Sequence, residues 1–187
     1  MRRSIAILSA IACTMLTMGL AMAAEKLAPG QVDFGSFAPP SGGGEFVEVN
    51  VPGNLISLAA KFVEKQEPEA AKLLNSIKQV RVNVIGIDEA NREDMQKRAL
   101  KVRTDLSTQG WERLVTAQKQ GQDVSVYLKM DPSSVIQGLT VVVIEGSKQA
   151  VFANIVGDIK PEQLSMLAEK LNIEPLKKIG EPAAEQK

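Results

Sequence analysis

The stretch from residue 141 to residue 171 constrains the fold most strongly, because it predicts a strand, a turn, a second strand and a helix in succession. Residues 141–144 (VVVI) are too β-branched and too few to favour a helix, so they predict a strand. A turn at residues 146–148 leads to the returning strand at 151–156. Pro161 suits the first turn of a helix, where its missing N–H costs nothing. The helix that we expect to close the core carries apolar residues at i, i+3, i+4 and i+7: Leu164, Leu167, Ala168 and Leu171.

The first half of the chain shows the same two periodicities. Alternating apolar and polar residues predict half-buried strands at 45–51 and 80–84. Between them Asn54 is a candidate N-cap, and Pro68 divides the helical pattern into one kinked helix or two. Two strands joined by a helical segment suggest a β-α-β unit with a parallel crossover. The apolar positions of the helical pattern are Leu55, Leu58, Ala59, Phe62 and Val63 before Pro68, and Ala70, Leu73, Leu74 and Ile77 after it.

The middle of the chain predicts one further helix and two further strands. Acidic residues crowd the start of this helix, where the macrodipole favours anions, and Gly110 is placed to end it in a left-handed conformation. Strands are predicted at 111–117 and 124–130. The acidic residues are Asp88, Glu89, Glu93 and Asp94, and the expected buried stripe of the helix is Met95, Ala99, Val102 and Leu106.

These elements predict a single α+β domain with a mostly antiparallel sheet of about six strands. Their order is β-α-β-α-β-β-β-β-α, and we expect the helices to pack on one face of the sheet. The opposite face would then be open and could serve as an interaction surface. The residues expected on that face are Glu48, Arg81, Asn83, Tyr127, Lys129, Thr140 and Val142.

The ends of the chain predict export and flexible flanks. Residues 1–23 resemble a signal peptide, with two arginines, a long apolar run and the small-x-small sequence Ala21-Met22-Ala23 before the expected cleavage point. An uncleaved membrane anchor is the alternative. Lipoprotein processing at Cys13 is disfavoured, because alanine replaces the usual leucine before it and the apolar run continues past it. Residues 24–44 have the composition of a flexible Gly/Pro/Ser-rich linker, residues 45–173 would form the domain, and residues 174–187 a disordered tail. Phe34 and Phe37 stand out in the linker and could dock on the domain or on a partner.

Several of these segments together resemble a bacterial family, the domain of unknown function numbered 4252. The resemblance lies in residues 110–114 (GWERL), in the strands at 124–129 and 139–144, and in residues 156–159 (VGDI) before the leucine-patterned helix. It covers about residues 46–171. The family implies an exported α+β domain and supplies no activity, cofactor or catalytic residue.

The chemistry available to the chain is limited. There is no histidine, and Cys13 lies in the segment that we expect to be removed, which excludes histidine- and cysteine-based catalysis and the common zinc and haem sites. The acidic group at 88–94 lacks the spacing of a calcium loop. Asp158 is expected to organise a turn, and Trp111 to lie in the core. No cofactor is predicted.

The balanced charge and the lack of histidine- and cysteine-based catalytic groups together favour a protein that acts by binding. The chain has 22 basic and 22 acidic residues, so nothing electrostatic predicts nucleic acid or an anionic membrane as a partner. We expect an exported, non-enzymatic module of the cell envelope that binds an unidentified envelope protein or assembles with itself, without inserting in the membrane after signal cleavage. The alternative is an extracytoplasmic protein that binds a small ligand or a cation.

Overall fold

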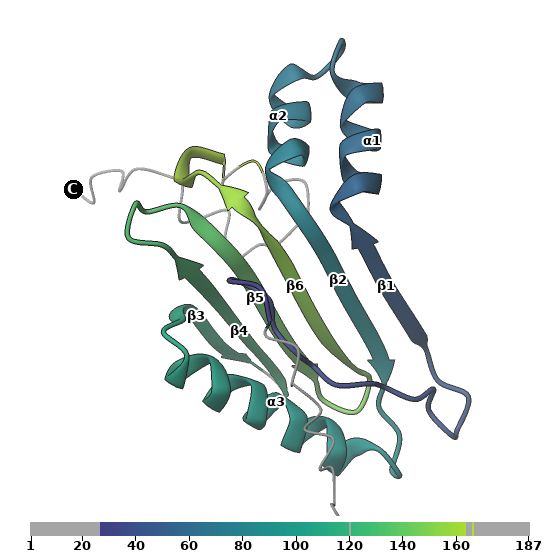
Figure 1. The fold of residues 1–187 in the computed structure, drawn as a ribbon. Coiled ribbons are helices and arrows are strands. Elements are labelled where there is room, and N and C mark those ends of the chain that lie inside the picture. The colour runs from purple at the N-terminus through teal and green to yellow at the C-terminus, as the bar shows by residue number, and fades with distance from the viewer. Residues whose placement is uncertain (1–26, 120, 164–165, 167–187) are drawn as a thin grey trace, which may run out of the picture.

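The computed structural model describes residues 27–119, 121–163 and 166, and these residues form one α+β domain. Six antiparallel strands make one sheet in the order β1-β2-β6-β5-β4-β3, which confirms the predicted fold class and element order (Figure 1). The elements are β1 (Phe46–Pro52), α1 (Gly53–Val63), α2 (Pro68–Ser76), β2 (Ile77–Gly86), α3 (Arg92–Thr108), β3 (Glu112–Lys119), β4 (Gln122–Met130), β5 (Ile136–Glu145), β6 (Gln149–Ile159) and a 3₁₀ turn (Pro161–Gln163). The predicted signal peptide, the leucine-patterned part of the last helix and the C-terminal tail lie outside the described residues.

β1 and β2 pair antiparallel, with Val47 opposite Val84 and Val51 opposite Val80. The predicted parallel crossover is therefore wrong. Two short helices connect the strands, because Pro68 starts a second helix rather than kinking the first. These helices form a hairpin that carries the chain back to the end of the sheet from which it left (Figure 1), so the second strand must run in the opposite direction.

The helical hairpin begins tightly against β2. Its first residue is Gly53, where a Cβ would lie only 2.7 Å from the carbonyl oxygen of Lys78. Pro52 occupies the N-cap position and no side chain caps α1, so the prediction of Asn54 as the cap is wrong. The need for close approach of the backbone decides where this helix starts.

α3 lies across one face of the sheet and buries Met95, Ala99, Val102 and Leu106, the stripe that the sequence predicts. The helix ends as expected at Gly110, which adopts φ 74°, and the N–H of Trp111 then donates to the carbonyl of Leu106 at 3.2 Å. α1 and α2 instead place Ile56 and Leu73 in a cluster on the other face. The helices are thus divided between the two faces rather than packed together on one.

Residues 27–44 form an extended segment, here called the strap, that crosses the same face as α3 (Figure 1). Val32 and Phe34 are buried in the cluster beneath α3, and the rings of Phe34 and Phe37 lie 5.6 and 5.1 Å from the ring of Phe152. The prediction of a flexible linker is therefore wrong for this part of the chain. The Gly/Pro/Ser-rich composition suggests flexibility, but three apolar side chains of this segment pack against the sheet.

The opposite face of the sheet is lined by valines. One row of side chains crosses all six strands through the pairs Val49–Val82, Val82–Ala153, Ala153–Val141, Val141–Val126 and Val126–Val115. We call this surface the valine face. On β1, β2, β6 and β5 it consists of Val47, Val49, Val51, Val80, Val82, Val84, Val151, Ala153, Ile155, Leu139, Val141 and Val143.

The two faces are the reverse of those that the sequence predicts. Asn83, Tyr127, Thr140 and Val142, expected to be open to partners, are at most 1% exposed beneath α3 and the strap. Meanwhile most side chains of the valine face are only half-buried. Alternation separates the faces of a strand, but it does not say which face the rest of the chain covers. Here the strap brings both apolar rings and hydrogen-bonding backbone to the face that carries the polar residues.

Candidate functional site

The seven residues predicted to form an interaction face are either buried or make contacts within the chain. Apart from the four buried ones, Arg81 donates from Nη2 to the carbonyl of Gly35 in the strap at 2.9 Å, and its Nη2 lies 3.8 Å from Oε1 of Glu48. Lys129 donates from Nζ to the carbonyl of Gln109 at the end of α3. These residues hold the strap and α3 in place, and the structure does not bring them together as a free surface.

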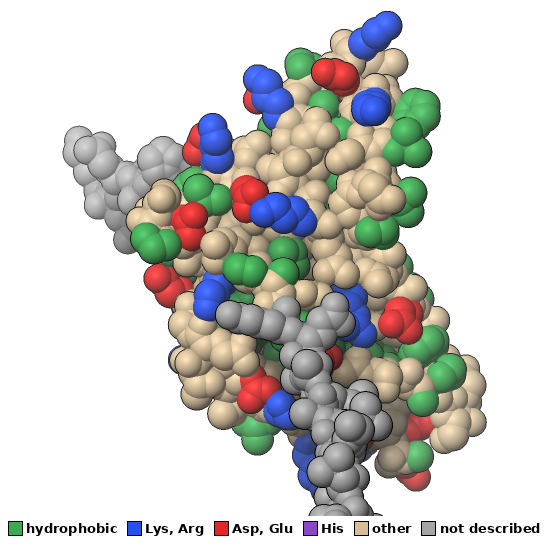
Figure 2. All heavy atoms as spheres, viewed as in Figure 1, with side chains coloured by type: hydrophobic (Ala, Val, Ile, Leu, Met, Phe, Trp, Pro, Cys, Tyr) green, Lys and Arg blue, Asp and Glu red, His purple; other side chains and the backbone are tan. Residues whose placement is uncertain are grey.

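The exposed apolar side chains gather elsewhere, on β1 and α1. Eight large hydrophobic residues are exposed among the described residues, and five of them lie on these two consecutive elements. Figure 2 shows apolar side chains along the edge of the molecule that α1 and β1 form. We call this surface the β1–α1 strip, and its members are Val47 (38% exposed), Val49 (37%), Leu55 (52%), Leu58 (50%) and Phe62 (76%).

The helical part of the strip follows a pattern that the sequence shows, but the pattern does not indicate that it is exposed. Leu55, Leu58 and Phe62 keep the helical spacing of an apolar stripe, which is more often the buried side of a helix. In the structure Ile56 and Ala60 are the buried residues of α1, because they turn toward α2 and the sheet. The leucines and the phenylalanine therefore point away from the domain.

The two edge strands of the sheet differ in the way they are protected. β3, at one edge, carries exposed polar residues and a break in register between Arg113 and Val115. Charged side chains and bulges of this kind discourage pairing with another strand. β1, at the other edge, pairs with β2 in unbroken register and presents Val47 and Val49. Its free backbone edge is the better template for an added strand.

A groove runs along the middle of the valine face. It has a volume of about 230 Å³ and an almost wholly apolar lining from three neighbouring strands, β2, β6 and β5. The lining residues are Val80, Val82, Leu139, Val141, Val151, Ala153 and Ile155. No polar side chain lines it, so it is suited to apolar side chains rather than to a charged ligand.

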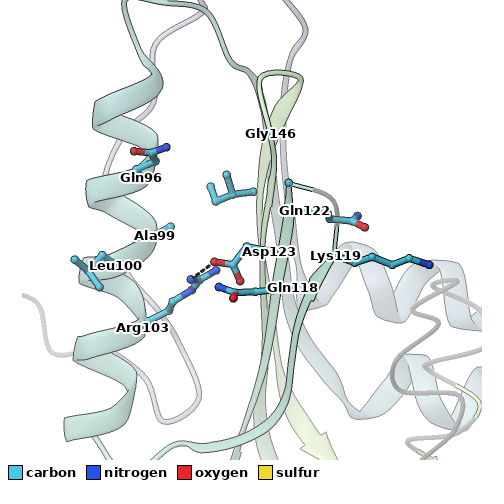
Figure 3. Close-up of a pocket in the computed structure, with 11 residues that line it drawn as sticks. Gln96, Ala99, Leu100, Arg103, Gln118, Lys119, Gln122, Asp123 and Gly146 are labelled. Carbon is cyan, nitrogen blue, oxygen red and sulfur yellow. Dashed lines mark hydrogen bonds and ion pairs between the residues drawn. The ribbon is translucent and has the colours of Figure 1, made fainter.

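A larger and more polar pocket of about 550 Å³ lies between α3 and the β3–β4 hairpin (Figure 3). At its centre Nη1 of Arg103 and Oδ2 of Asp123 form an ion pair at 2.6 Å. Nε and Nη2 of Arg103 and Oδ1 of Asp123 are buried and have no hydrogen-bond partner. Gln118 lies beside this pair, and Gln96 and Gln122 also line the pocket. The pocket could hold a small polar molecule.

Sequence reasoning missed this pair. Arg103 stands one turn after the buried Ala99 on a helix rich in charge, and Asp123 follows Gly121 in what reads as a turn. Nothing in their spacing indicates that β4 brings the aspartate under the helix.

The acidic residues near the start of α3 serve local structure. Glu93 pairs with Lys97 and Asp94 with Arg98, each at 2.7 Å on successive turns of the helix. Among the described residues, no group of three acidic side chains is arranged to hold a metal ion.

Asp88 ties the turn before α3 to the end of the strap. Its Oδ1 accepts the N–H of Asn91 at 2.8 Å, and its Oδ2 accepts the N–H of Gly42 at 3.2 Å. These backbone donors, the Asn91 N–H first, lower the pKa of the Asp88 carboxyl below its ordinary value of 3.8. The carboxylate is a structural acceptor at this position.

Asp158 differs from its predicted role, whereas Trp111 lies where the sequence predicts. Asp158 lies within β6 and forms an exposed ion pair with Lys78 at 2.7 Å, so the predicted turn role is wrong. Trp111 is 7% exposed and lies in the core cluster, as predicted.

Fold and surface together define a small α+β domain with a strapped, buried face and an apolar outer edge. The chain belongs to the family described as "Domain of unknown function (DUF4252)", whose model matches residues 42–167. The comparison with curated proteins and the comparison with solved structures each gave no match. Residues 27–41 of the strap precede the matched range. Within the described part of the chain, none of the helices has the length and hydropathy needed to cross a membrane.

Proposed function

We propose that this protein is a non-enzymatic assembly module of the cell envelope, and that copies associate through the β1–α1 strip. The observation that carries the proposal is that five of the eight exposed large hydrophobic residues in the described chain lie on two consecutive elements at one edge of the sheet. Export rests on the predicted signal peptide in residues 1–23, which lie outside the described residues.

The strip is large enough in apolar content to favour association. Burying a Leu or Phe side chain completely is worth about 1.5–3 kcal/mol. Leu55, Leu58 and Phe62 are half or more exposed, so a partner that covered them would recover a substantial part of that free energy. Exposed apolar side chains that gather at one edge of a domain are typical of interaction sites.

A second copy fits this edge because the strip is self-complementary. Two β1 strands can pair antiparallel about a two-fold axis near Val49, which would continue the sheet into the second copy and place the two α1 helices at opposite ends of the β1 pair. An unrelated envelope protein with an exposed strand or apolar helix is the other occupant that this edge would accept.

Analytical ultracentrifugation of wild type, Phe62→Lys and Val49→Lys tests the proposal. Wild type is expected to form a dimer or larger assembly that both variants dissociate. Thr116→Lys is the matched control, because it adds the same charge at an exposed position of the opposite edge strand and is expected to leave the assembly intact. A wild-type protein that is monomeric at all concentrations contradicts self-assembly. Photo-crosslinking from position 62 in cells then tests the other envelope protein.

A second candidate function is binding of a small polar ligand in the pocket between α3 and the β3–β4 hairpin. It is favoured by the unpaired buried atoms of Arg103 and Asp123. A ligand that binds only the native state must raise the melting temperature of the protein. A stabilising shift from a metabolite panel or calcium that disappears in Arg103→Met would support this function, and no shift from any compound would count against it.

A further inference from the structure

We propose that the C-terminal segment from residue 164 to residue 171 docks as a helix in the groove of the valine face of its own chain. The groove would then be an internal docking site, separate from the β1–α1 strip. This inference goes beyond the proposed function and does not depend on it.

The groove is an apolar surface in the middle of a sheet. Val82, Val141 and Val151 are half-buried there, although β2, β6 and β5 are interior strands with a neighbour on each side. Central strands of an antiparallel sheet that are apolar on one face normally have that face covered. α3 and the strap cover the other face, and α1 and α2 add Ile56 and Leu73 to the cluster on this one without filling the groove.

The chain itself leads to this face. β6 ends at Ile159, the 3₁₀ turn Pro161–Gln163 follows, and Met166 packs against the same apolar cluster as Leu139, Ile155 and Ile159. Residues 167–187 continue from that point. In our proposal the first part of this continuation therefore starts at the end of the groove.

The sequence of that segment matches the groove in chemistry and in size. Leu164, Leu167, Ala168 and Leu171 make one apolar stripe if residues 164–171 are helical. Such a stripe is about 10 Å long at a rise of 1.5 Å per residue. The groove runs from Val151 to Ile155 on β6, about 13 Å at 3.3 Å per residue. Leucines entering a surface of valine and alanine bury apolar area without leaving a polar group unpaired.

Met166 would stand on a different side of this helix from the leucines. The cluster that it contacts extends from the sheet to Ile56 and Leu73 of the helical hairpin. In the proposed arrangement Met166 would contact the hairpin part of this cluster, and the leucine stripe on the other side of the helix would enter the groove.

Disulfide trapping in the full chain tests the proposal, in a background of Cys13→Ser and Phe62→Lys so that assembly through the strip does not contribute. Ala153→Cys in the groove is paired with Leu167→Cys on the leucine stripe, or with Glu169→Cys on the opposite side of the helix as the matched control. Equal amounts of light and isotopically heavy protein are mixed before oxidation, and linked peptides are measured by mass spectrometry. The expected result is several-fold more linkage from Leu167→Cys than from Glu169→Cys, with light–light and heavy–heavy peptides alone.

Equal yields from the two positions, or no linkage from either, would overturn the proposal. Mixed light–heavy peptides would also overturn it, because they would assign the groove to a second copy. A second measurement guards against a cysteine variant that fails to fold. Leu167→Asp with Leu171→Asp is expected to raise the fluorescence of a hydrophobic dye several-fold over Glu169→Ala, and equal fluorescence would again contradict the docked helix.

Discussion

At the scale of single residues, Asn154 does most to join the strap to the sheet. Its side chain is 2% exposed, and its Oδ1 accepts the N–H of Val32 at 3.2 Å. Its Nδ2 donates to the carbonyl of Gly30 at 3.0 Å and also contacts the carbonyl of Leu139 and the hydroxyl of Thr140. One amide thus satisfies backbone groups of the strap that would otherwise be buried without partners.

Replacing Asn154 by alanine is expected to destabilise the domain by about 1–3 kcal/mol, because it leaves buried donors and acceptors unpaired. Urea denaturation measures the change. Asn50→Ala is the control, since Asn50 is exposed and bonds only to the side chain of Gln79 among the hydrogen bonds described for it. A loss no greater than that of the control would mean that Asn154 does not hold the strap.

The pH dependence at Asp88 has a definite sign. Because the folded pKa of this carboxyl lies below its ordinary value of 3.8, its contribution is present above that value and is lost as the pH falls through the folded pKa. Melting temperature measured against pH is expected to fall more steeply under acid for wild type than for Asp88→Asn. Parallel curves for the two proteins would show that the hydrogen bonds from Asn91 and Gly42 do not favour the ionised form.

At the scale of elements, the strap is the part that composition misrepresents most. Phe34→Ala is expected to cost about 3–5 kcal/mol, the range for a buried aromatic residue, because Phe34 is 4% exposed and packs against Phe152. Leu100→Ala on α3 is the control, since Leu100 is 66% exposed. Chemical denaturation compares the two, and equal small effects would mean that the strap is not docked in solution.

The elements also show how far a sequence alone can lead. Period-two and helical patterns predict the strands, α3 and its cap, because those patterns record burial within one element. The same patterns do not indicate which other segment of the chain covers each face of the sheet. Val32 and Phe34 alternate with Asp33 as in a strand, and this was the available signal for the strap, but the surrounding glycines and prolines obscured it. The outward turn of Leu55 and Phe62 depends on how the helical hairpin returns to the sheet, which no local pattern determines.

At the scale of the whole molecule, the apolar character of one edge predicts how association of copies responds to temperature and salt. The β1–α1 strip is apolar, so we expect association to weaken on cooling and to persist in high salt, as hydrophobic contacts do and screened charges do not. Sedimentation equilibrium at several temperatures and salt concentrations measures both effects. Dissociation by salt alone would instead assign the contact to charged residues outside the strip.

The strap also sets the order in which the chain can reach its final form. Its backbone contact with Asn154 joins residues 122 positions apart in the sequence. β6 is the last strand of the described residues, so the strap leaves the ribosome early and has no docking site until β6 has followed it. Contacts between such distant residues form slowly. The segment next to the predicted signal peptide therefore lacks its docking site while the domain is being synthesised, which would suit the export that we propose.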